Sequence, residues 1–352
     1  MGQILGLGIT HYPPLCYKGN MSRRIKLLLA DPLLPEHLRS PANWHPTMRE
    51  QWGSDEGQAH SDKHRSDLIH HFRKARAELD AFEPDFVLLW GDDQYENYQE
   101  DCIPPFSVLA YDSVDVQPWK GHQRAQNWWD EPADKTFTIK GHRKAAKHLV
   151  TGLLEEGVDV AYSYKPLHHP LGHAFVNSIL YLDFDRKGFP YPVVPFTINA
   201  YGRWVIAQHG EPKTPSEAAK IAEQTELDPP GPQPWRCFQV GGAIARVLAR
   251  SPYRVAVIAS SSWSHSFLVA KHALMFPDVE SDKRYYEALR TADWTPWRTT
   301  KIEEAEDRGH HELLNWFCLT GAMAELGRRP DETMFLESWI SNSSKVFAAF
   351  RP

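Results

Sequence analysis

The stretch LLWGDDQYENY, residues 88–98, is an apolar run that ends on two adjacent acids, a glutamine and a group of polar and aromatic side chains. A short, continuously apolar run of this kind is typical of a strand covered on both faces of a sheet. In open α/β sheets, ligands bind beyond the carboxyl ends of the strands. The stretch therefore predicts a buried strand that delivers Asp92, Asp93 and Gln94 to a binding site.

Other runs share this β-rich character, at residues 2–10, 158–164, 191–199 and 253–260. Helical patterns lie between and after them, at residues 66–82, 141–157, 215–227, 240–251 and 309–326. In the first helix, Leu68 and Leu79 lie on one apolar stripe, and Ser66 and Asp67 are expected near its N-cap. The alternation predicts an α/β fold with a central mixed, mostly parallel sheet, helices on both faces and the site at the strand carboxyl ends.

Two polar, Trp-rich stretches, near 33–65 and 112–136, lack clean periodicity and are too long for simple connectors. We expect them to be insertions or lids in a single α/β domain that spans residues 1–352.

The composition gives expectations about nucleic-acid binding, membrane insertion and redox state. The chain is 42% hydrophobic, and its formal net charge of -6 gives no reason to expect nucleic-acid binding. No apolar run approaches the roughly 20 residues of a membrane span, and the N-terminal residues lack the basic and cleavage features of a signal peptide. The four cysteines are far apart and unpatterned, so a reduced, cytoplasmic protein is expected.

Histidines follow several of the predicted strands: His11 follows the first, His173 the third and His265 the last. A single histidine after a strand is usually a surface or capping residue. Several strand ends that carry His or Asp in one chain favour a shared site, and histidine is the commonest metal ligand. Glu312, at the start of the last long helix, offers a carboxylate, although the helix dipole alone also favours an acid there.

Taken in order, the motifs THYPPL, QYENYQEDCIPPF, GHAFVNSILYL, SSWSHSFL and HHELLNW resemble the class III extradiol ring-cleavage dioxygenases, the superfamily of the catalytic subunit of protocatechuate 4,5-dioxygenase. The resemblance implies a non-haem Fe(II) enzyme that opens a dihydroxylated aromatic ring with O2. Carried over to this chain, it assigns metal binding to His11 and Glu312, and proton and O2 handling to His173 and His265. A His/His/carboxylate set of this kind leaves open positions on the metal.

The chain departs from the family at one position. The family's second iron histidine falls on Gln94, whose neutral carbonyl oxygen is a weaker Fe(II) ligand than imidazole. Three explanations remain open: Asp92 or Asp93 turns inward, His60 or His64 replaces the histidine, or the metal site is degraded and the scaffold serves another use. One of the two acids is also expected to cap the following turn.

The leading prediction is an extradiol-type dioxygenase with metal at His11, Gln94 and Glu312. Fe(II) is expected, with Mn or Zn as the other candidates. The expected partners are a small aromatic substrate and O2, with no nucleic acid or membrane. Assembly into a homo-oligomer is left as an open alternative. The alternatives are a Zn- or Mn-dependent hydrolase or lyase on the same scaffold, and a non-catalytic binding protein.

Overall fold

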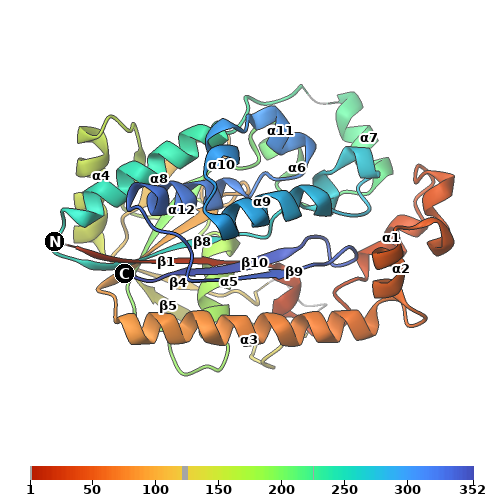
Figure 1. Ribbon diagram of the computed structural model, residues 1–352, viewed down its shortest axis with the longest axis horizontal. Helices are drawn as coiled ribbons and strands as arrows, with labels where there is room; N and C mark the ends of the chain where they lie inside the picture. The colour runs from red at the N-terminus through yellow and green to blue at the C-terminus, as the bar shows by residue number, and fades with distance from the viewer. Residues whose placement is uncertain (1, 121–125, 225) are drawn as a thin grey trace.

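The computed structural model describes residues 2–120, 126–224 and 226–352, and it contains one large mixed sheet with helices on both faces (Figure 1). Its strands are β1 (Gln3–Ile9), β2 (Phe86–Asp92), β3 (Phe106–Leu109), β6 (Ala161–Ser163), β7 (Val193–Ile198), β8 (Arg254–Ser260), β9 (Glu332–Leu336) and β10 (Lys345–Phe350), in the order β6-β3-β7-β2-β8-β1-β10-β9. A separate hairpin pairs β4 (Ser113–Val116) with β5 (Phe137–Lys140).

The helices are α1 (Arg24–Leu29), α2 (Pro46–Trp52), α3 (Gln58–Phe82), α4 (Arg143–Glu155), α5 (His173–Leu182), α6 (Val205–Gln208), α7 (Pro215–Gln224), α8 (Pro234–Ala249), α9 (Val279–Thr291), α10 (Thr295–Thr299), α11 (Ile302–Asp307) and α12 (Leu314–Glu325). Helices α4, α8 and α12 cover one face of the sheet, and α3 and α5 cover the other (Figure 1).

The middle of the sheet is parallel. Strands β7, β2, β8 and β1 run in the same direction, so their carboxyl ends meet at one edge. The sheet is mixed because β3 pairs antiparallel with β7, and β10 pairs antiparallel with β1. The predicted fold class, a mixed and mostly parallel sheet between helices, is confirmed.

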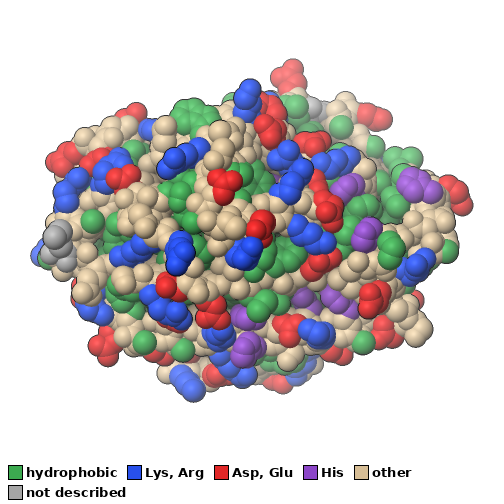
Figure 2. Space-filling view, viewed as in Figure 1, with side chains coloured by type: hydrophobic (Ala, Val, Ile, Leu, Met, Phe, Trp, Pro, Cys, Tyr) green, Lys and Arg blue, Asp and Glu red, His purple; other side chains and the backbone are tan. Residues whose placement is uncertain are grey.

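Successive residues of the central strands enter two different cores. Leu88 of β2 packs in the core under α8 and α12, and Leu89 packs in the core under α3 and α5. Since side chains alternate across a strand, both faces must be apolar, which explains the continuous apolar runs in the sequence. On the face seen in Figure 2, acidic and basic side chains are interspersed over the surface.

Helices α8 and α12 approach closely because glycines line their contact. A Cβ added at Gly241 would lie 1.9 Å from the carbonyl oxygen of Cys318, and one added at Gly321 would lie 1.9 Å from that of Phe238. Any larger residue must push the two backbones apart.

Helix α3 corrects one prediction: it begins at Gln58 with Gly57 as N-cap, and not at Ser66 and Asp67. The buried residues in the first turns of α3 are polar, in contrast to the apolar buried residues farther along the helix. Ser61 accepts a hydrogen bond from the Met21 backbone N–H, and Arg65 donates to the carbonyl oxygens of Leu15 and Gly19. These turns lie in the stretch near 33–65, where an apolar pattern cannot reveal them.

The stretch near 112–136 forms the β4–β5 hairpin and a Trp-rich segment, although its residues 121–125 lie outside the described part of the chain. Trp119 and Trp129 pack against each other with ring centroids 5.7 Å apart. The Trp129 indole N–H donates to the Phe184 carbonyl oxygen at 2.8 Å, and the Arg186 guanidinium lies 3.7 Å from the Trp129 ring centroid. The tryptophans therefore attach this segment to the body of the fold.

Within the described residues, no helix is both long and apolar enough to cross a membrane.

Candidate functional site

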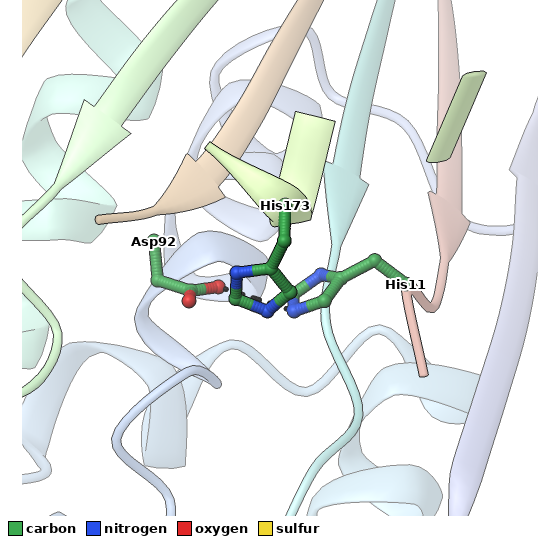
Figure 3. A group of neighbouring side chains, drawn as sticks. All are labelled: His11, Asp92 and His173. Atoms are coloured by element: carbon green, nitrogen blue, oxygen red, sulfur yellow. Dashed lines mark ion pairs between the residues drawn. The ribbon is translucent and has the colours of Figure 1, made fainter. Parts of the chain in front are cut away.

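The carboxyl ends of the parallel strands bring the predicted site residues together. His11 follows β1, Asp92 ends β2, and Glu312 lies two residues before α12 begins at Leu314. The Nε2 atom of His11 lies 3.5 Å from Asp92 Oδ1 and 3.3 Å from Glu312 Oε2. Figure 3 shows His11, Asp92 and His173 pointing toward one another, and one ligand atom of each lies within 4.8 Å of the others.

The backbone hydrogen bond of His11 leaves the inward nitrogen of its neutral ring without a hydrogen. Its Nδ1 lies 2.9 Å from the Ser260 carbonyl oxygen. Because a carbonyl oxygen only accepts hydrogen bonds, we assign the hydrogen of the neutral ring to Nδ1. The lone pair of Nε2 then faces Asp92 Oδ1 and Glu312 Oε2. These three atoms are all acceptors, so a proton or a cation is required between them.

His265, which follows β8, repeats this arrangement on the other side of Glu312. Its Nδ1 lies 2.8 Å from the Trp263 carbonyl oxygen, and its Nε2 lies 3.3 Å from Glu312 Oε1. Among the described residues, Glu312 Oε2 is buried without a hydrogen-bond donor. The site therefore contains more acceptors than donors, and the donor set of imidazoles and carboxylates fits a divalent metal ion.

The outward oxygens of the same two carboxylates are fully engaged. The Gln94 carboxamide donates to Asp92 Oδ2 at 2.8 Å and to Glu312 Oε1 at 3.0 Å. The Tyr201 hydroxyl donates to Glu312 Oε1 at 2.7 Å. These bonds orient both carboxylates so that Oδ1 and Oε2 face His11.

Gln94 lies against Gly210. A Cβ added at Gly210 would lie 2.2 Å from Gln94 Oε1, so a larger residue there would displace the glutamine. Gly210 also has φ +65, a conformation that favours glycine. The amide nitrogen of Gln94 faces the carboxylates. Its predicted role as a metal ligand stays a prediction.

His173, the first residue of α5, is positioned by Glu96. The Glu96 carboxylate lies 2.9 Å from His173 Nδ1 and also accepts the His173 backbone N–H at 2.9 Å. This leaves Nε2 of the ring directed toward His11, whose ring centroid is 5.1 Å away. Burial by itself would lower the pKa of His173, but the carboxylates of Glu96, Asp92 and Glu312 raise it to about 10.

The other pKa shifts describe a compact group of opposed charges. Burial, and then repulsion from Glu312, raise the pKa of Asp92 to about 6. Burial would raise the pKa of Glu312, but His265 and His11 hold it below its usual value. Burial would lower the pKa of His11, but Asp92 and Glu312 raise it, whereas burial lowers the pKa of His265. In the metal-free protein, a protonated His173 therefore supplies positive charge beside these carboxylates.

The two acids have different roles. Asp93 accepts the backbone N–H groups of Glu96 and Asn97 at 3.0 Å and that of Tyr98 at 3.4 Å. It is therefore the acid that caps the turn, and Asp92 is the one that faces the site. Of the open alternatives, an inward acid is the one that the geometry favours.

His60 and His64 occupy a different place. The His60 Nε2 atom lies 3.1 Å from Ser338 Oγ, and the two histidine rings stack on each other with centroids 5.6 Å apart. Both sit on α3, and the structure does not bring them to His11.

Tyr201 and Glu96 were not singled out from the sequence. Tyr201 lies shortly after the carboxyl end of β7, and a position after a strand's carboxyl end is also what identified His11 and Asp92. Glu96 stands in the opening motif, but only the fold shows that it reaches His173.

A cavity of about 1100 Å³ opens onto this group. The site residues that line it are Gln94, Glu96, His173, Tyr201, His265 and Glu312, and its other walls include Tyr12, Pro14, Met21 and residues 115–120 of the hairpin segment. A mostly apolar cavity with a few convergent polar groups is the usual form of a small-molecule site.

Comparison with known proteins agrees with this geometry. Residues 215–348, which include His265 and Glu312, match the family model described as the catalytic LigB subunit of aromatic ring-opening dioxygenase. The chain is 30% identical over 193 residues to a 2,3-dihydroxyphenylpropionate/2,3-dihydroxicinnamic acid 1,2-dioxygenase of Paraburkholderia xenovorans (strain LB400), a match that covers 54% of this chain and 46% of that protein. The chain thus spans about half the length of that relative.

Two relatives with the same name match a larger share of this chain and of their own length. The one from Rhodococcus rhodochrous is 22% identical over 286 residues, which is 73% of this chain and 81% of that protein. The one from Azotobacter vinelandii (strain DJ / ATCC BAA-1303) is 22% identical over 315 residues, which is 79% of this chain and 90% of that protein. The chain is thus similar to proteins of the class III extradiol ring-cleavage dioxygenase superfamily, which confirms the resemblance carried by its motifs.

Proposed function

We propose that this protein is a metal-dependent, extradiol-type dioxygenase that opens the ring of a dihydroxylated aromatic compound with O2. The observation that carries the proposal is the convergence of His11 Nε2, Asp92 Oδ1 and Glu312 Oε2 beside a cavity that is large enough for an aromatic substrate and is lined by Glu312 and His173. The family match and the names of the relatives support the reaction class. The cytoplasmic location expected from the scattered cysteines stays a prediction.

His11, Asp92 and Glu312 would hold the metal through these three inward atoms. In this proposal Gln94 supports the centre from outside, because its NH2 group donates to Asp92 Oδ2 and Glu312 Oε1. One imidazole and two carboxylates form a harder ligand set than the family's two histidines and one glutamate. Such a set suits Fe(II) and also Mn(II). When bound, the metal would supply open positions at which a catecholate and O2 meet.

His173 and His265 would handle protons on either side of this group. Glu96 fixes the His173 ring so that Nε2 faces the site, and it favours the protonated ring, which can return a proton to the opening substrate. His265 Nε2, which lies 3.3 Å from Glu312 Oε1, is placed to hold or accept a proton beside the residues that would hold the metal. Both residues line the cavity, so a bound ring lies within their reach.

Anaerobic reconstitution with Fe(II) or Mn(II), followed by exposure to O2 and a panel of catechols, tests the proposal. The expected result is stoichiometric O2 uptake, with a yellow ring-opened product detected by absorbance. The Glu312→Gln variant should lose the bound metal and this activity together. Metal-loaded protein that consumes no O2 with any catechol would contradict the dioxygenase proposal. Zn-dependent hydrolysis would favour the hydrolase alternative instead.

A further inference from the structure

Asn315 reaches the candidate metal group from the start of helix α12. It is the second residue of that helix, it is fully buried, and its side chain extends to the carboxyl ends of two strands. Its Nδ2 donates to the Ser260 carbonyl oxygen at the end of β8 at 3.0 Å and, over a longer 3.4 Å, to Asp92 Oδ1 at the end of β2. One amide nitrogen therefore links α12 to both strand ends.

Both acceptors bear directly on the residues that would hold the metal. The Ser260 carbonyl oxygen also lies 2.9 Å from His11 Nδ1, so it orients the ring whose Nε2 points inward. Asp92 Oδ1 is the carboxylate oxygen that lies 3.5 Å from this Nε2. Asn315 consequently contacts the atom that orients His11 and the atom through which Asp92 would bind the metal.

The two oxygens of Asp92 each accept a hydrogen bond from a side-chain amide. Gln94 donates to Oδ2 at 2.8 Å, and Asn315 donates to Oδ1. One donor on each oxygen sets the plane of the carboxylate. A carboxylate oxygen can accept along two lone-pair directions, so the bond from Asn315 leaves one direction of Oδ1 for a metal ion.

The carbonyl oxygen of the Asn315 amide has no such partner. It is buried, and no group among the described residues donates to it. A buried acceptor without a donor costs stability, and a leucine, which has the same branched shape, would avoid that cost. What asparagine offers and leucine lacks is the NH2 group directed at Ser260 and Asp92.

We propose that Asn315 is a positioning residue of the metal centre. It holds Asp92 so that the carboxylate binds the metal through Oδ1 alone, and it fixes this carboxylate relative to His11. The amides of Asn315 and Gln94 together would thus make Asp92 a defined ligand. This inference rests on the proposed function for the presence of the metal. Asn315 lies outside the cavity lining and takes no part in ring opening.

Metal binding and the spectrum of bound Mn(II) test this role in the full-length protein. The Asn315→Leu variant removes both donated bonds and keeps the branched shape of the side chain. It should bind Mn(II) about ten- to a hundredfold more weakly than wild type in a chelator competition under argon. The electron paramagnetic resonance spectrum of its Mn(II) complex should also change, because Asp92 becomes free to rotate and to bind through both oxygens. A merely structural role for Asn315 would leave that spectrum as in wild type.

Thr320→Val is the matched control. Thr320 is fully buried on the same helix, and its hydroxyl donates to the carbonyl oxygens of Trp316 and Phe317 within that helix. This variant should keep the wild-type affinity and spectrum. Urea denaturation without metal shows whether each variant folds. If Asn315→Leu does not fold, Asn315→Ser, whose hydroxyl is too short to reach both acceptors, should show the same two changes.

An unchanged affinity or an unchanged spectrum in a folded Asn315 variant would overturn the assignment. An equal loss of affinity in Thr320→Val would overturn it too, because the effect would then belong to the helix as a whole. Wild-type protein that binds no divalent metal ion would contradict the proposed metal centre, and the role of Asn315 with it. Neither a catechol nor O2 is used, so failure of the dioxygenase reaction alone appears separately and does not alter these results.

Discussion

Replacing Asp92 by asparagine should make the metal-free protein more stable and, at the same time, remove its stabilisation by a divalent cation. Asp92 is fully buried, and its carboxylate faces that of Glu312 across His11. Without a metal, this arrangement places two negative charges around one imidazole. The asparagine side chain keeps the shape of the aspartate and an acceptor for the Gln94 NH2 group but removes one of these charges.

The pKa of Asp92 gives the size of the effect. Its folded-state pKa of about 6 lies above the usual value of 3.8, so the folded protein binds a proton more tightly than the unfolded chain. A group with a raised pKa contributes stability below its unfolded pKa, and this contribution is lost as the pH rises through the folded value. At pH 8 the penalty of the ionised carboxylate is therefore fully present. At about 1.4 kcal/mol per pKa unit, it is on the order of 3 kcal/mol, and the asparagine variant should recover part of it.

Urea denaturation of the chelator-treated proteins at pH 8 and pH 5, with and without Mn(II), measures both effects. The variant should be more stable than wild type at pH 8, and the difference should shrink at pH 5. Wild type should gain about 2.7 kcal/mol when the metal concentration is a hundred times its Kd, whereas the variant should gain little. A variant that is less stable without metal, or that is stabilised by Mn(II) as strongly as wild type, would refute the reasoning.

Other consequences can be checked independently. Glu96→Gln should lower the pKa of His173 in the metal-free protein, as followed by NMR titration of the ring, and an unchanged titration would remove Glu96 from its positioning role. Gln94→Ala should weaken divalent-metal binding about ten- to a hundredfold in a chelator competition assay, and equal or tighter binding would show that its two donated bonds are dispensable. Gly241→Ala should destabilise the protein by about 1–3 kcal/mol in urea because its Cβ would meet a backbone carbonyl. The neighbouring Gly242→Ala, whose nearest contact is a side-chain oxygen at 3.3 Å, should be tolerated, and equal losses in the two variants would contradict the close-packing argument.

The fold was predictable where burial leaves a simple pattern. The central strands appear as continuous apolar runs because each contributes to two cores. Helix α5 is not evident in the sequence, because every residue after His173 is buried, including the polar Asn177 and Ser178, so no exposed polar face gives a helical period. Strand β10 is not evident in the sequence because it begins with a lysine. Lys345 is fully buried and donates to the carbonyl oxygens of Ser341 and Ser343.

The site was predictable at the level of strand ends. His11, Gln94, Glu312, His173 and His265 follow from motif order, and the structure brings these side chains to one place.

The choice between Asp92 and Asp93 was not predictable, because adjacent residues of a strand point to opposite sides. Which of them turns inward depends on the pleat of β2 and the turn that Asp93 caps. His60 and His64, four residues apart, have the spacing of a helical metal pair, but their helix carries them to Ser338 and away from His11.

We propose that His11, Asp92 and Glu312 share one metal ion and that Gln94 supports the two carboxylates. A crystal structure of anaerobically Fe(II)-loaded protein, with anomalous scattering measured at the iron edge, tests it most directly. We expect one anomalous peak, coordinated by His11 Nε2, Asp92 Oδ1 and Glu312 Oε2, with the Gln94 nitrogen still bonded to the outward oxygens. A peak coordinated by the Gln94 carbonyl oxygen in place of Asp92, or no peak at this site, would contradict it.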